Sequence, residues 1–191
     1  IPSAQCTIWY MPDSGTARSA LLDRVITHAA THGIADQSLR DLATGLGSSH
    51  RMLLYHFGSR EGLIAAIVER VEAGQRQLLD SLGERHDDPA ELIREHWFWL
   101  TQPETLAQVR LFYELAGRAV HGQPGTELFT EQFLAPWLAA GRRASETLGV
   151  PLDEPLLRAG IALLRGLLLD VVITGDLAGA IGALGWSRPL I

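Results

Sequence analysis

The segment 33–63 limits the possible folds of this chain more than any other part. It reads GIADQSLRDLATGLGSSHRMLLYHFGSREGL. Its first half predicts a short helix, because Ser38 and Asp41 have the spacing of an N-terminal capping box. The apolar residues of this helix recur at steps of three and four and therefore share one face: Leu39, Leu42, Ala43 and Leu46. Gly45 and Gly47 then predict a tight reversal, since glycine adopts positive φ without steric cost.

A second short helix follows the glycine turn. Either Ser48 or Ser49 caps its start, and we expect Met52 and Leu53 to pack against the first helix. The other side chains are unusually polar for about two helical turns: Ser49, His50, Arg51 and Tyr55. Two helices joined by a glycine turn, with the second polar on its free side, indicate a helix-turn-helix. An ordinary helical hairpin whose polar side is solvated fits the same pattern.

The order of motifs within the segment favours the helix-turn-helix. A glycine and an apolar residue precede a serine-led helix, and a second glycine and a serine precede the polar helix. The motifs are Gly33-Ile34, Ser38-Leu39-Arg40-Asp41-Leu42-Ala43, Leu46-Gly47, Ser49, His56-Phe57 and Ser59-Arg60-Glu61-Gly62-Leu63. Together they resemble the DNA-binding segment of the TetR family of bacterial transcriptional regulators. Two positions depart from the family pattern, because Leu54 replaces its usual tyrosine and Ser48 its valine or isoleucine.

The resemblance extends over residues 17–185 and implies an all-α chain. It places a three-helix DNA-binding head at 17–58, and the connecting helix, the effector-binding region and the dimerisation region at 59–191. Residues 1–16 form an irregular N-terminal segment, which proline and glycine interrupt and which contains no basic residue. No basic region precedes an apolar run there, so we do not expect a signal peptide.

Apolar periodicity predicts further helices outside the helix-turn-helix. Their expected ranges are 17–33, 60–82, 90–101, 104–121, 126–148, 153–174 and 176–185. Ser59 is expected to cap helix 60–82, which the resemblance identifies as the connection that carries the ligand state to the head. Pro136 predicts a kink or a break near Ala135, because proline removes a backbone donor from a helix interior.

The charge distribution is that of a basic head on an acidic body. The whole chain has a net charge of −6, and all 16 of its basic residues are arginine. Residues 17–60 contain five arginines and three aspartates, a net charge of +2, whereas residues 61–191 have a net charge of −7. A locally positive segment is typical of a small DNA-binding domain. The single cysteine, Cys6, excludes an intrachain disulfide and favours a cytoplasmic protein.

Aromatic residues gather in the second half of the chain, with a few polar residues between them. Each of them individually fits an ordinary core position, but as a group they suit a mostly apolar ligand cavity with orienting polar groups. The resemblance also implies an effector pocket in this region, for a small molecule of unknown identity. The candidates for the pocket are Trp97, Phe98, Arg110, Phe112, Tyr113, Glu114, Phe133 and Trp137.

Helix 153–174 is apolar on nearly every side, so it must be buried on every side. Arg158, Arg165 and Asp170 interrupt its apolar run and argue against a membrane span. In a small domain such a helix packs one face on its own core and the other on a second subunit, and the resemblance likewise implies a homodimer. The candidates for the dimer interface are Leu157, Ile161, Leu164, Leu168 and Val172.

The sequence contains no catalytic or cofactor-binding motif that we would assign. There is no GxSxG, no P-loop and no GxGxxG, so we expect neither an enzyme nor a cofactor. His28 and His32 are four residues apart and could share a metal, but no third ligand follows at a diagnostic spacing. We therefore predict no metal site.

The resemblance implies a ligand-responsive repressor that binds a palindromic operator as a dimer. The expected base contacts are Ser49, His50 and Arg51, at the start of the recognition helix. The expected phosphate contacts are Ser38, Arg40, Tyr55, His56 and Arg60. For His56, capping or packing within the head is an equal alternative. The alternative function is an all-helical small-molecule-binding protein of the same fold that does not regulate DNA.

Overall fold

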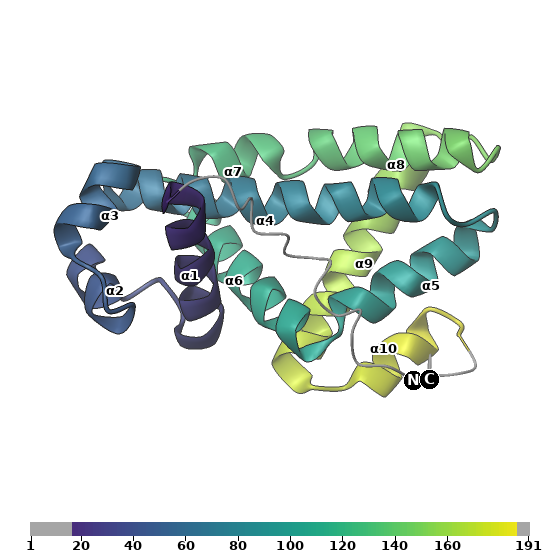
Figure 1. Cartoon of the computed structure of the whole chain (residues 1–191). Coiled ribbons are helices and arrows are strands. Elements are labelled where there is room, and N and C mark those ends of the chain that lie inside the picture. Colours follow the sequence, from purple (N-terminus) through teal and green to yellow (C-terminus); the bar gives the residue numbers. More distant parts are fainter. Residues whose placement is uncertain (1–16, 187–191) are drawn as a thin grey trace. The chain divides into compact units, whose positions relative to one another are not determined.

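The computed structural model describes residues 17–186, and this part of the chain is all-helical (Figure 1). Its helices are α1 (Ala17–His32), α2 (Leu39–Gly45), α3 (His50–Phe57), α4 (Arg60–Gly83), α5 (Pro89–Leu100), α6 (Pro103–Val120), α7 (Glu127–Gln132), α8 (Ala135–Thr147), α9 (Glu154–Thr174) and α10 (Leu177–Ala183). Each predicted helix is present, with its ends shifted by a few residues at most. The predicted irregular segment 1–16 lies outside the described residues.

Polar side chains cap the helices where the sequence predicted them. The capping box of α2 is complete, since the Ser38 hydroxyl accepts from the Asp41 amide and the Asp41 carboxylate accepts from the Ser38 amide. Ser49, and not Ser48, caps α3. At the start of α4 the Ser59 hydroxyl accepts from the amide of Gly62 at 3.1 Å. These caps satisfy amide groups that have no partner within their own helix.

The predicted break near Ala135 is confirmed. Helix α7 ends at Gln132, and α8 begins at Ala135 with Pro136 in its first turn. Proline is tolerated at this position because the first-turn amides lack an intrahelical acceptor in any case. The chain therefore forms two helices where a single one would have placed Pro136 in its interior.

The described residues divide into two compact units. Unit 1 comprises residues 17–75 and Leu111–Gln132, and unit 2 comprises Arg76–Arg110 and residues 133–186. Helices α4 and α6 each contribute residues to both units. The predicted DNA-binding segment 17–58 lies entirely within unit 1.

An apolar core holds unit 1 together. The apolar face of α1 is buried, and Leu53 of α3 packs into the same cluster. Met52 was predicted to pack beside Leu53, but its side chain is exposed. The reason is geometric: Leu53 and Phe57 are four residues apart and occupy the inner face of α3, while Met52 lies about 100° away around the helix.

Unit 2 has its own interior, in which α9 contacts α8 and α10. Its buried side chains include Trp97, Leu138 and Leu168. Helix α9 was predicted to pack one face on its own domain and the other on a second subunit. Within the single chain, Leu168 and Val171 are its buried residues. Among residues 17–186 no helix combines the length and the apolar character that crossing a bilayer requires.

Candidate nucleic-acid interface

Local hydrogen bonds fix the start of each helix of the motif. The Asp41 carboxylate accepts from the Ser38 hydroxyl at 2.6 Å and from the Ser38 amide at 3.0 Å. These bonds lower the pKa of Asp41, the hydroxyl bond being the larger cause. Gly47 has a φ of 58°, which an L side chain rarely adopts, and the chain then enters α3 through Ser49. The Ser49 hydroxyl accepts from the amide of Met52 at 3.1 Å.

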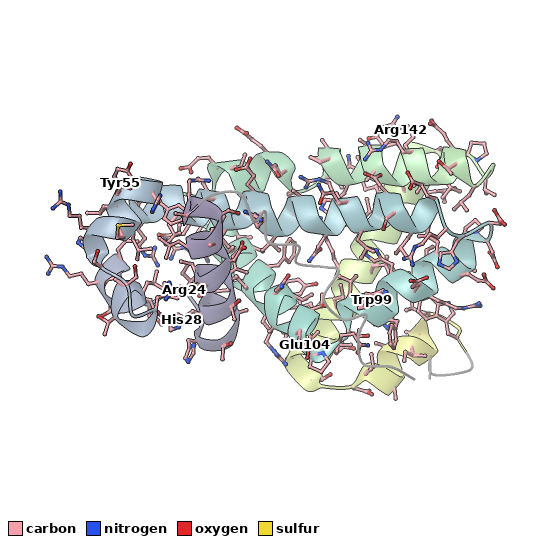
Figure 2. The ribbon with its side chains drawn as sticks, in the orientation of Figure 1. Arg24, His28, Tyr55, Trp99, Glu104 and Arg142 are labelled. Atoms are coloured by element: carbon pink, nitrogen blue, oxygen red, sulfur yellow. The ribbon has the colours of Figure 1, made fainter. Side chains whose placement is uncertain are left out.

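Helix α3 exposes one polar face because its opposite face is anchored. Leu53 and Phe57 are buried, so the side chains half a turn away from them point outward. Arg51 and Tyr55 are four residues apart on that outer face, and both are exposed. Figure 2 shows Tyr55 projecting away from the ribbon of α3. The arrangement presents a cation and a phenol side by side to whatever binds this face.

Three of the five arginines in 17–60 have structural contacts. Arg18 donates from Nε to the carbonyl oxygen of His56 at 3.1 Å, and its guanidinium lies 5.2 Å from the centre of the Phe57 ring. Arg24 donates to the carbonyl oxygen of Leu46, in the turn (Figure 2). Arg60 has the same kind of role, since it donates to backbone carbonyl groups of the loop before α2. These side chains fasten α1 and α4 to the helix-turn-helix.

The two remaining arginines, Arg40 and Arg51, are exposed. Neither forms an ion pair with a carboxylate in the described part of the chain. They lie on α2 and α3, the two helices of the motif. The helix-turn-helix therefore presents two arginines that no carboxylate neutralises, in addition to the exposed Arg18 and Arg24 of α1.

The loop 33–37 is held from both sides by opposite charges. Arg60 donates from Nη2 to the carbonyl oxygens of Ile34 and Ala35, at 2.7 and 2.9 Å, and from Nε to that of Gln37 at 3.0 Å. On the amide side, the Glu114 carboxylate of α6 accepts from Ile34 at 2.8 Å and also from Ala35. We predicted a phosphate contact for Arg60 and a pocket position for Glu114. In the structure both side chains bind this loop.

The other predicted DNA contacts occupy different settings. Ser49 and Arg51 are exposed at the start of α3, whereas His50 is half-buried. The Ser38 hydroxyl is engaged in the capping box. His56 is half-buried, and its ring packs edge-on against Tyr55 with centroids 5.0 Å apart. Two exposed residues of α3 were not predicted, Met52 and Leu54, although the positions of Leu53 and Phe57 on a helical wheel could have indicated them.

The predicted pocket residues are divided between the two units. Phe112, Tyr113 and Glu114 belong to unit 1, where the Phe112 ring packs against Phe129 with centroids 5.2 Å apart. Unit 2 contains the other candidates: Trp97, Phe98, Arg110, Phe133 and Trp137. The candidates form two groups, and in unit 1 at least one of the rings serves the core.

Two polar residues in unit 2 were not predicted as site residues. The Arg165 guanidinium lies 4.2 Å from the centre of the Phe133 ring and 5.5 Å from that of Trp137. His96 packs edge-on against the same Trp137 at 6.4 Å. Burial lowers the pKa of His96 to about 4, so its ring is neutral near pH 7. Its Nδ1 atom has no hydrogen-bond partner among the described residues.

The predicted interface residues of α9 lie on its inner stripe. Leu168 is buried, and Leu157, Ile161, Leu164 and Val172 are half-buried. The exposed apolar side chains of this helix are different ones: Leu156, Leu163, Leu169 and Ile173. Because α9 is apolar on both sides, its sequence did not show which face packs within the chain.

The histidine pair on α1 packs between helices. The rings of His28 and His32 stack with centroids 4.3 Å apart, and His28 Nε2 is 3.1 Å from Oε1 of Gln37. A Cβ atom on Gly45 would come within 2.5 Å of the His28 ring, so glycine permits this contact. In the described part of the chain, no group of three His, Cys, Asp or Glu side chains is placed to hold a metal ion.

Comparison with known proteins identifies the fold. No family model and no curated protein matches the sequence. Among solved structures, one from Rhodococcus sp. assigned to the TetR family is 24% identical, with a TM-score of 0.69 over 88% of this chain and 96% of that one. A TetR-family transcriptional regulator from Pectobacterium atrosepticum is 22% identical, with a TM-score of 0.63 over 91% and 95%. The chain therefore has the TetR fold, with an N-terminal helix-turn-helix head and a helical C-terminal region.

Replacement of Glu114 by alanine is expected to lower the free energy of unfolding by roughly 1–3 kcal/mol, because the buried Ile34 amide loses its acceptor. Glu114→Gln keeps a carbonyl oxygen and should lose less. Urea denaturation measures both. Glu69→Ala, which removes an exposed carboxylate from α4, is the control and should change little. Equal effects of Glu114→Ala and Glu69→Ala would contradict the role of this carboxylate.

Proposed function

We propose that this chain is a DNA-binding transcriptional regulator of the TetR family. The observation that carries the proposal is the outer face of α3, where Arg51 and Tyr55 are exposed while Leu53 and Phe57 anchor the helix from behind. A short helix with a firm apolar anchor and a free basic face suits insertion into a major groove. The shared fold with TetR-family structures supports the same function.

In this proposal the residues of the helix-turn-helix divide into two roles. Arg51 binds a guanine edge with two hydrogen bonds, the commonest specific contact of arginine, and Ser49 and His50 contact neighbouring bases. Arg40 and Tyr55, with Ser38 and His56 beside them, contact phosphates and set the register. Arg60 is not among the proposed phosphate contacts, because its donors bind the loop 33–37.

Replacement of Arg51 by alanine tests the DNA-binding function. We expect selection from randomised duplex DNA to enrich a palindrome. Arg51→Ala should bind that palindrome roughly 5- to 150-fold more weakly for each half-site, since a bidentate base contact is worth about 1–3 kcal/mol. Arg142→Ala removes an exposed arginine of unit 2 that has no proposed role and should bind like the wild type. Failure of a folded dimer to enrich any sequence at low salt would favour the alternative, a ligand-binding protein of the same fold.

We further propose that the chain acts as a homodimer through α9. Leu156, Leu163 and Ile173 are exposed in the single chain, and Cβ atoms added to Gly160 or Gly166 would meet nothing within 4 Å. Open glycines beside exposed leucines allow a second helix to approach closely. Two heads related by a twofold axis would then read half-sites about 34 Å apart, or a multiple of that distance.

A charge on this face should separate the subunits. Leu163→Glu is expected to sediment as a monomer and to lose operator binding, because a buried unpaired carboxylate costs several kcal/mol at an interface. Val150→Glu introduces the same charge at an exposed apolar position outside α9 and is the matched control. A wild-type protein that sediments as a monomer at micromolar concentration would rule out the dimer.

A ligand response is the third part of the proposal. Arg165, stacked on Phe133 and Trp137 beside the buried His96, offers a cation between flat rings and an unpaired imidazole nitrogen. These groups suit a small aromatic anion, which would bind more tightly to one state of the regulator and so repress or release transcription. Titration with aromatic carboxylates is expected to give different affinities for the free and the operator-bound protein. Equal affinities would contradict the response.

A further inference from the structure

Large apolar side chains are exposed at one place in residues 17–75. The exposed fractions are 42% for Met52, 38% for Leu54 and 80% for Tyr55, and all three residues belong to α3. Elsewhere in these residues the large apolar side chains are buried or half-buried. A scattered exposed leucine needs no explanation, but three exposed apolar side chains on an eight-residue helix form a patch.

The three side chains have different directions on the helix. Tyr55 lies opposite the buried pair Leu53 and Phe57, at the centre of the outer face. Met52 is three residues before Tyr55 and therefore shares its side of the helix. Leu54 lies on the other flank, about 100° from Tyr55. Met52 is thus the apolar residue that is both on the outer face and in the first turn of α3.

The major groove offers few partners for such a side chain. Base edges there present hydrogen-bond donors and acceptors and a single apolar group, the C5-methyl of thymine. Residues in the first turn of a recognition helix are the ones that contact base edges. Methionine is unbranched and polarizable, so it adapts its shape to a methyl group that it covers.

We propose that Met52 reads the C5-methyl group of a thymine in each half-site of the operator. The proposal rests on the proposed DNA-binding function and adds to it the class of base that lies beside Arg51. Arg51 and Met52 are neighbours in the first turn, so a guanine and a thymine close to each other in the half-site are the expected pair.

The test removes single methyl groups from the DNA. In the operator obtained by selection, each thymine is replaced in turn by deoxyuridine, which differs only in lacking the C5-methyl. We expect one thymine per half-site at which this replacement weakens binding of the wild-type protein roughly fourfold, since burying one such group is worth about 0.8 kcal/mol. Met52→Ala should bind the thymine and deoxyuridine operators equally.

Leu54→Ala is the matched control, because it removes an exposed apolar side chain from the opposite flank of α3. It should keep the difference between thymine and deoxyuridine. Thermal unfolding of both variants checks that the head is intact. Loss of the difference in Leu54→Ala and not in Met52→Ala would overturn the assignment, and so would the absence of any methyl-dependent position in an operator that the wild type binds. Failure to bind any operator would instead refute the DNA-binding function itself.

Discussion

Two side chains of opposite charge hold the loop on which the helix-turn-helix depends. Arg60 binds the carbonyl groups of Ile34, Ala35 and Gln37, and Glu114 binds the amide groups of Ile34 and Ala35. A six-residue connection between α1 and α2 has few backbone partners of its own, and Ile34 is completely buried. Unsatisfied polar groups there would be costly. The position of α2, and of α3 after it, therefore depends on one residue from α4 and one from α6.

The placement of the arginines in unit 1 explains how an acidic protein can present a basic surface. Arg18, Arg24 and Arg60 bind carbonyl groups within unit 1, so their charge contributes to structure. Arg18 and Arg24 are nevertheless exposed on α1, and Arg40 and Arg51 are exposed on the two helices of the motif. A few outward charges on a rigid support place positive potential where a groove would be, although the whole chain has a net charge of −6. The exposed Met52 and Leu54 of α3 add apolar groups to that surface.

The apolar interior of unit 2 also contains polar side chains, and some of its apolar side chains are exposed. His96 is buried and neutral, and Arg165 lies over aromatic rings, while α9 leaves a row of leucines uncovered. An interior optimised for stability alone would avoid an unpaired imidazole nitrogen. Buried polar groups and uncovered apolar ones in the same unit are consistent with a region that binds a ligand and a second subunit, as we propose.

The sequence by itself determined the helices, because caps, proline and apolar period act over a few residues. Ser38 with Asp41, Ser49, and Pro136 each predicted an end or a break that the structure contains. It also identified the helix-turn-helix, whose motifs lie within one short segment. Only the tertiary structure decided which partners the polar side chains bind. Glu114 accepts a hydrogen bond from a loop 80 residues away in the chain, and Arg60 donates to the same loop. Likewise, Met52 was expected to pack inward but is exposed, and the sequence of α9 did not show which of its apolar sides packs within the chain. Apolar period shows which residues share a face but not which face meets the core.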